Sequence, residues 1–231
     1  MKIFAISDLH LSLSGEKPMD IFGYSWEDYL NKIELDWQNK VSDEDIVLIS
    51  GDISWAMKQE DALKDIEFIS KQKGKKILIR GNHDYWWQSI TKLREMMPKD
   101  IFLLQNDAVK IGNFVFCGSR GWAVEGSPDF KEHDRKIYER ESERFKLALN
   151  CAKKLKEEGD KLIALIHYPP FNVRLESSLF TKLFEEFSVD KVVYGHLHGK
   201  DVKTYLKTNI NKVEYILASC DIVGNKLVEV L

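Results

Sequence analysis

The chain has 231 residues, 44% of them hydrophobic and 31% charged, and its acids and bases nearly cancel to a formal net charge of -3. A chain of this length can bury one sizeable core, so we expect a single domain over residues 1–231. The near balance of charge gives no broad positive field, which makes nucleic acid an unfavoured partner. No apolar stretch approaches the ~20 residues needed to cross a bilayer, so no membrane contact is expected.

The amino terminus and the cysteines indicate a cytoplasmic protein. The opening residues become acidic at Asp8, before an apolar run long enough for a secretory signal can form. Cys117, Cys151 and Cys220 are widely spaced, odd in number and without a Cys-x-x-Cys pair. We therefore expect buried thiols in a reducing compartment rather than a disulfide framework or a structural zinc site.

Strand-like and helix-like patterns alternate in the first part of the chain. Apolar runs predict three buried strands, at Lys2–Ser7, Asp45–Ile49 and Lys75–Ile79. Helical patterns lie between them, at Trp26–Asn39, with Ser25 as the expected N-cap, and at Gln59–Lys71. This order of strands and helices is typical of a parallel sheet.

Shorter apolar runs follow and predict a second sheet. The first of them are at Ile101–Leu103, Ala108–Ile111 and Phe114–Gly118. A highly charged surface helix is expected from about Lys131 to Glu158, before strands at Lys161–Ile166 and Lys191–Tyr194. The tail adds three antiparallel candidates, at Val202–Leu206, Glu214–Ala218 and Lys226–Val230. The expected fold is therefore one α/β domain with two sheets.

The chemistry lies where these strands end. Five strand candidates stop at residues of metal-ligand type, which are Asp8 with His10, Asp52, Asn82 with His83, His167, and His196 with His198. In open α/β sheets, ligands bind outside the carboxyl ends of the strands. Five of the six histidines lie in these turns and only His133 lies elsewhere, so chance placement is a poor explanation.

Each motif alone has a simpler interpretation. Asp8-Leu9-His10 can be a solvated turn, Gly51-Asp52 is common in turns, and a single core histidine would account for His167. Together and in this order, the residues predict a metal site. Carboxylate, carboxamide and imidazole without thiolate suit manganese, iron or zinc, and two ions can be held if Asp52 bridges them.

The five blocks resemble the signature of the calcineurin-like metallophosphoesterases, which reads Asp-x-His, Gly-Asp, Gly-Asn-His-Asp/Glu, a lone His and Gly-His-x-His. All five occur here in that order, between Asp8 and His198. The resemblance implies a two-sheet β-sandwich flanked by helices, with two divalent metal ions. One ion would be held by Asp8, His10 and His198, the other by Asn82, His167 and His196, and Asp52 would bridge the two.

The resemblance also implies an enzyme, a metal-dependent phosphoric ester hydrolase acting on a small phosphomonoester or phosphodiester. The nucleophile would be a hydroxide that bridges the two ions. His83 would not bind metal but would donate a proton or stabilise charge at the leaving group. Asp84 would hold the ring of His83 by a hydrogen bond.

Departures from the motifs of known branches of the family narrow the range of expected substrates. Protein phosphatases resembling calcineurin carry an arginine in Gly-Asp-x-x-Asp-Arg-Gly, whereas this chain reads Gly-Asp-Ile-Ser-Trp-Ala-Met from Gly51. Lipid-sugar pyrophosphatases of bacterial envelopes usually have arginine where this chain has His83. His167-Tyr168-Pro169-Pro170 resembles the His-x-Pro-Pro of phosphodiesterase branches, although Pro-Pro also ends strands. Monoesters and diesters both stay open.

Four residues near the blocks are candidate substrate contacts. Arg80 and Arg120 could bind phosphate, although such arginines, like Arg174, are more often ordinary surface or salt-bridged residues. Trp55 and Trp86 could stack on a base or an aromatic leaving group, worth ~1–3 kcal/mol per stacked base. Packing of the loops is the simpler interpretation of these two rings.

Two other classes of function stay open. Related DNA-repair nucleases share the five blocks, but the lack of a basic patch and of a further domain weighs against a nuclease. A noncatalytic scaffold with the same fold usually loses ligands or the third-block histidine, and this chain has lost none. The sequence does not define the oligomeric state or the role of Leu11–Tyr24, a segment that could form a lid.

Overall fold

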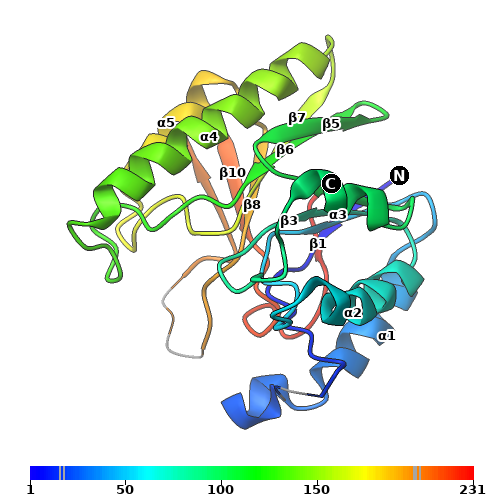
Figure 1. Cartoon of the computed structure of the whole chain (residues 1–231). Helices are drawn as coiled ribbons and strands as arrows, with labels where there is room; N and C mark the ends of the chain where they lie inside the picture. Colours follow the sequence, from blue (N-terminus) through cyan, green and yellow to red (C-terminus); the bar gives the residue numbers. More distant parts are fainter. Residues whose placement is uncertain (16, 18, 200–201, 203) are drawn as a thin grey trace.

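The computed structural model describes residues 1–15, 17, 19–199, 202 and 204–231. Within these residues, two β-sheets stack face to face with helices on their outer sides (Figure 1). The first sheet runs in the order β11-β1-β2-β3-β4. Its strands are β1 Ile3–Ala5, β2 Ile46–Ile49, β3 Lys75–Ile79, β4 Ile101–Leu104 and β11 Val228–Glu229. Strands β1 to β4 are parallel, and β11 is antiparallel to β1.

The second sheet runs in the order β5-β6-β7-β8-β10-β9. Its strands are β5 Asp107–Ile111, β6 Phe114–Ser119, β7 Lys161–Ile166, β8 Lys191–Tyr194, β9 Lys207–Ile210 and β10 Val213–Leu217. Strands β6, β7, β8 and β10 are parallel, and antiparallel pairing adds β5 and β9 at the two edges. The parallel strands of each sheet therefore end together at one edge.

The strands are continuous apolar runs because both of their faces are buried. In β1, Ile3 and Ala5 contact the core between the sheets, whereas Phe4 belongs to the core under the helices of the first sheet. The core between the sheets is completed from the second sheet by residues such as Phe116 and Ile163. Successive side chains of one strand thus point into two different cores, rather than into one core and the solvent.

The helices cover the outer faces of the sheets (Figure 1). The first sheet carries α1 Tyr29–Lys40, α2 Gln59–Lys71 and α3 Ile90–Met96, and the second carries α4 Asp134–Leu155 and α5 Leu179–Glu186. Short 3-10 turns, η1 Asp20–Phe22 and η2 Tyr24–Trp26, precede α1. In the described part of the chain, no helix is both long enough and apolar enough to cross a membrane.

The expected α/β fold of two sheets flanked by helices is confirmed. The predicted bounds of α2, β3, β7 and β8 agree with the structure residue for residue. The charged helix predicted over Lys131–Glu158 is α4. Its apolar side chains, among them Tyr138, Phe145 and Leu149, recur at helical spacing and are buried against the second sheet.

The predicted start of the first helix is wrong. The helix begins at Tyr29 rather than Trp26, and Ser25 lies in the 3-10 turn that precedes it instead of capping it. Asp28 occupies the cap position with a left-handed φ of 52° and makes no side-chain capping bond. The reason lies in tertiary packing. Trp26 is buried with its ring 5.3 Å from that of Tyr29, and this contact holds the 3-10 turn outside the helix.

The tail also differs from expectation. Val202–Leu206 is not a strand in its described residues, with Lys203 lying outside them, and β9 begins instead at Lys207. The tail was expected to be antiparallel throughout, but β10 pairs in parallel with β8 as well as antiparallel with β9. Because β10 is parallel to β8, its last residues reach the same sheet edge as the candidate ligands that follow β8.

Candidate metal centre

The sequence motifs converge at the carboxyl edge shared by the two sheets. Asp8 and His10 follow β1, Asp52 follows β2 and Asn82 follows β3, all from the first sheet. His167 follows β7, while His196 and His198 follow β8, all from the second sheet. Parallel strands bring these turns together although they are separated by nearly the whole chain.

The backbone of the site is held in an uncommon conformation. Asp8, His10, Asp52 and His196 all have left-handed φ values, of 58°, 45°, 50° and 71°. Such values cost free energy in residues other than glycine and persist only where the surroundings enforce them. Part of that enforcement comes from the carboxylate of Asp8, which accepts a hydrogen bond from the backbone N–H of His196 at 3.0 Å.

Two glycines let the turns approach one another. A Cβ at Gly81 would lie 2.1 Å from Oδ1 of Asp52, and a Cβ at Gly195 would lie 2.2 Å from Oδ2 of Asp8. Real Cβ atoms do not come so close to other heavy atoms, so only glycine fits at these two positions. The glycines of the sequence motifs therefore make room for the carboxylates of neighbouring turns.

The first group of ligand-type atoms comes from Asp8, His10 and His198. The ligand atoms of these three side chains all lie within 4.8 Å of one another. Oδ1 of Asp8 is 3.3 Å from Nε2 of His198, and that nitrogen is 3.4 Å from Nε2 of His10. One carboxylate and two imidazoles thus point at a common centre.

The second group comes from Asp52, His167 and His196, with Asn82 beside them. Oδ1 of Asn82 lies 2.7 Å from Nε2 of His167 and 2.9 Å from Nδ1 of His196. The two imidazole nitrogens are themselves 3.3 Å apart. A carboxylate, a carboxamide and two imidazoles converge here in the same way.

Asp52 lies between the two groups. Its Oδ2 atom is 3.5 Å from Nε2 of His167 in the second group and 3.7 Å from Nε2 of His10 in the first. Its Oδ1 atom accepts the backbone N–H of His83 at 2.8 Å, which fixes the carboxylate plane. The free oxygen therefore faces ligand atoms of both groups.

The hydrogen bonds of the histidines leave the inward nitrogens available to a cation. Nδ1 of His167 donates to the carbonyl oxygen of Ser50 at 2.9 Å, so Nε2 carries the lone pair in the neutral ring. Nδ1 of His198 faces Oδ1 of Asp221 at 2.9 Å, with the same consequence. Imidazoles held from behind by a carbonyl or a carboxylate are typical of metal ligands, so these residues fit divalent cations.

The electrostatics of the site agree with that fit. Burial lowers the pKa of His10 to about 4 and that of His196 to about 3. Burial also opposes protonation of His167 and His198, but neighbouring carboxylates raise their pKa values to about 9 and about 10. The carboxylates thus favour positive charge at His167 and His198, and a bound cation would supply that charge in place of a proton.

Asp221 is a functional candidate that the sequence motifs do not contain. Its Oδ1 atom accepts the Nδ1 proton of His198 at 2.9 Å, and its Oδ2 atom accepts the backbone N–H of Gly199 at 2.9 Å. A signal was present in the sequence, because Asp221 is a carboxylate just beyond β10. That strand could not be assigned to the edge of β8 without its parallel pairing.

We expect Asp221→Asn to weaken metal binding by ~10–100-fold, the range found when an outer partner of a histidine ligand is lost. The physical reason is that the amide no longer fixes the tautomer and orientation of His198. Calorimetric titration of metal-free protein with Mn²⁺ measures the effect. The control is Asp43→Asn, which changes an exposed aspartate before β2. Equal affinities in the wild-type protein and the Asp221 variant would contradict this role.

Asp84 does not hold His83, contrary to expectation. Its buried carboxylate accepts four hydrogen bonds, from the backbone N–H groups of Gly81 at 2.7 Å, Ile53 at 2.9 Å and Ser54 at 3.1 Å, and from Nε1 of Trp86 at 2.9 Å. These donors occupy the lone pairs that the ring of His83 would need. Asp84 therefore ties the turn after β3 to the turn after β2.

His83 is placed by aromatic packing instead. Its ring is 4.6 Å from that of Trp55 and 5.7 Å from that of His10, measured between centroids. The side chain is half-buried, and burial is the main cause that lowers its pKa. His83 thus lies beside the two ligand groups without belonging to either of them.

The candidate substrate contacts Trp55 and Trp86 lie in different surroundings. Trp55 is half-buried and stacks on His10 at 4.7 Å, and Nζ of Lys17 lies 4.8 Å from the centroid of the Trp55 ring. Trp86 is 1% exposed and lies in the core of the first sheet, so the expectation that it meets substrate is wrong. Its indole is held inward by the hydrogen bond to Asp84.

The arginines also separate. Arg80 and Arg120 line one polar cavity together. Arg174 lies elsewhere, exposed and paired with Glu176 at 2.9 Å.

Of the segment Leu11–Tyr24, residues 16 and 18 lie outside the described part of the chain. Sδ of Met19, in the same segment, accepts the indole N–H of Trp55 at 3.0 Å.

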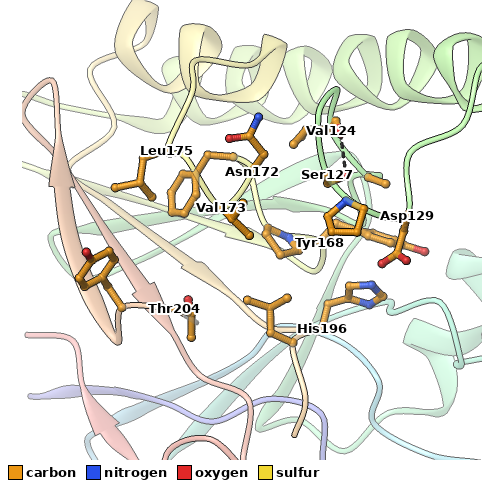
Figure 2. A pocket seen from close by; sticks show the side chains of 15 residues that line it. Val124, Ser127, Asp129, Tyr168, Asn172, Val173, Leu175, His196 and Thr204 are labelled. Carbon is orange, nitrogen blue, oxygen red and sulfur yellow. Dashed lines mark hydrogen bonds between the residues drawn. The ribbon is translucent and has the colours of Figure 1, made fainter. Parts of the chain in front are cut away.

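An apolar cleft of about 110 Å³ adjoins the second ligand group (Figure 2). His196 and Tyr168 are part of its wall, and their rings are 4.2 Å apart. Val124, Val173 and other apolar side chains make up most of the lining, which also contains Ser127, Asp129, Asn172 and Thr204. The cleft therefore places an apolar surface directly beside a candidate metal ligand.

Carboxylate, carboxamide and imidazole side chains that converge at the strand ends of a two-sheet α/β fold form a candidate site for divalent metal ions. A family model described as calcineurin-like phosphoesterase matches residues 1–200, and the chain belongs to that family. Its members typically use divalent metals to hydrolyse phosphoesters. The predicted family is thereby confirmed.

Three similar proteins illustrate how far the similarity extends. The uncharacterized protein MJ1445 of Methanocaldococcus jannaschii is 28% identical over 126 residues, which are 54% of this chain and 68% of that protein. Two solved structures share the fold at 14% identity. The protein of unknown function AQ665 from Aquifex aeolicus has a TM-score of 0.53, covering 99% of this chain and 95% of that one. The protein TT1561 of Thermus thermophilus has a TM-score of 0.59, with 98% and 96% covered.

Proposed function

We propose that the protein is a binuclear metal-dependent phosphodiesterase. The observation that carries the proposal is the position of Asp52, whose Oδ2 atom faces His10 of one ligand group and His167 of the other. A carboxylate in that position can be shared by two cations. In this proposal Asp8, His10 and His198 hold one ion, and Asn82, His167 and His196 hold the other.

Two divalent cations held there would supply a nucleophile from water near neutral pH and would neutralise charge on the phosphoryl oxygens. The chain itself supplies the rest. Asp221 and Ser50 orient His198 and His167 from behind. His83, beside both groups, donates a proton to the departing oxygen, a task suited to an imidazole because its charge changes near working pH.

The apolar cleft favours a diester over a monoester. In this proposal the one ester group of a phosphomonoester departs beside His83, and its ionised oxygens gain nothing from apolar surroundings. A diester carries a second ester group, which can occupy the cleft beside His196 and Tyr168. The His-Tyr-Pro-Pro motif, which contributes Tyr168 and Pro169 to that cleft, agrees with this assignment.

Protein loaded with Mn²⁺ should hydrolyse bis-p-nitrophenyl phosphate faster than p-nitrophenyl phosphate. Cyclic nucleotides and dinucleotides extend the panel to natural diesters. A chelator should abolish the activity and added metal should restore it, because the ligands have no other way to activate water. No cleavage of any ester by the metal-loaded protein would favour a noncatalytic scaffold, and a faster reaction with the monoester would contradict the diester assignment.

A further inference from the structure

A second cavity, of about 170 Å³, lies where the ends of β3 and β6 meet α4. Its walls are polar and carry more positive than negative charge. The residues that line it are Arg80, Leu104, Gln105, Asn106, Ser119, Arg120, Glu141 and Arg144. Three arginines and one glutamate give these walls a formal charge of +2. We call this cavity the arginine pocket.

The arginines of the pocket are incompletely neutralised. Glu141 has a side-chain exposure of only 2%, and it is shared by Arg144 at 2.7 Å, Arg140 at 3.3 Å and Arg120 at 3.7 Å. Nε of Arg80 is buried and has no hydrogen-bond partner among the described residues. A buried donor without an acceptor costs free energy, so the guanidinium of Arg80 is not fully satisfied by the described residues.

The pocket adjoins the candidate metal centre. Arg80 is two residues before Asn82, so their Cα atoms are at most about 7.6 Å apart. The backbone carbonyl of Arg120 accepts the N–H of His167 at 3.0 Å. Arg80 therefore extends from the strand end that carries Asn82, and Arg120 extends from β6, the strand next to the one that carries His167. Guanidinium groups match the geometry of phosphate oxygens and can bind them in a bidentate manner.

We propose that the arginine pocket binds a second phosphate group of the substrate, separate from the phosphoester that is cleaved. The substrate class is thus a phosphodiester that bears an additional phosphate. This inference rests on the proposed function in one respect, namely that the bound molecule is a substrate. The binding of phosphate by the pocket does not depend on turnover. Phosphate fits the pocket because its negative oxygens would balance the excess positive charge of the three arginines that line it.

The first experiment measures binding without catalysis. Metal-free full-length protein is titrated with inorganic phosphate in a calorimeter. We expect Arg144→Gln to weaken binding about tenfold or more, the loss of one charge-assisted hydrogen bond. Arg135→Gln is the matched control, since Arg135 lies on the same helix but pairs with Glu125 at the surface. Equal binding by the wild-type protein and the Arg144 variant would overturn the proposal.

A second variant separates binding from folding. Glu141 competes with an anion for the same guanidinium groups, so Glu141→Gln should tighten phosphate binding. A merely structural Glu141 would give weaker binding or none. If this variant fails to fold, Arg144→Gln still decides, because Arg140 and Arg120 continue to neutralise Glu141.

The third measurement connects the pocket to substrate. The KM values of Mn²⁺-loaded protein are compared for thymidylyl-thymidine with and without a 5′-terminal phosphate. We expect the phosphorylated dinucleotide to have the lower KM in the wild-type protein, and Arg144→Gln to remove about tenfold of that advantage. Turnover with no such advantage would overturn the inference and leave the proposed function in place. Phosphate binding that depends on Arg144, without turnover of any ester, would overturn the proposed function and support the pocket.

Discussion

Asp52→Asn will leave the protein with fewer than two metal ions per chain. The substitution keeps the shape of the side chain and its acceptor for the N–H of His83, but it removes the charge that faces both ligand groups. We expect a loss of metal affinity at least as large as the ~100-fold caused by losing an outer partner of a ligand. Elemental analysis of protein saturated with Mn²⁺ and then desalted gives the count.

Asp160→Asn is the control for that experiment. Asp160 precedes β7 at the amino edge of the second sheet, opposite to His167, and pairs with Lys110 at 2.7 Å. Its loss should leave the metal content unchanged. Two tightly held ions in the Asp52 variant would show that this carboxylate is not shared, and the binuclear proposal would then lose its main support.

His83→Ala will keep both metal ions and lose most of the turnover, by about 10²-fold or more for an ester with a poor leaving group. The retention of metal follows from the geometry, because His83 belongs to neither ligand group. The loss follows from its proposed role, because a poor leaving group departs slowly without a proton. The decrease should be smaller for p-nitrophenyl esters, whose leaving group is stable as an anion.

His133→Ala is the matched control, because His133 is exposed and lies outside the site. Metal content and kcat are measured together for both variants. Loss of metal from His83→Ala would mean that this side chain supports the ligands. Undiminished turnover on an alkyl ester would mean that protonation of the leaving group takes another route.

The sequence predicted the parts of this fold that depend on local patterns. Buried parallel strands are continuous apolar runs, so the first and last residues of β3, β7 and β8 could be predicted from the extent of those runs. The residues that converge at the candidate metal centre could be predicted because each of them lies in the turn after such a strand. The start of α1 could not be predicted, because the burial of Trp26 against Tyr29 overrides the capping pattern around Ser25.

The partners of individual side chains were beyond the sequence. Asp84 is next to His83 in the chain, yet its oxygens accept from Gly81, Ile53 and Ser54 because the turns after β2 and β3 are packed together. The position of Asp221 behind His198 could not be predicted, because it depends on β10 lying parallel to β8. Both cases concern contacts between strands, which local spacing does not encode.

Each ligand group draws its members from both sheets. Asp8 and His10 belong to the first sheet and His198 to the second, and the same division separates Asp52 from His167. A cation in either place would therefore cross-link the two layers of the sandwich. By mass action, an ion at a hundred times its Kd adds ~2.7 kcal/mol to the stability of the fold. The same ions would then serve catalysis and stabilise the contact between the two sheets. Depletion of the metal would therefore lower the stability of the protein as well as its activity.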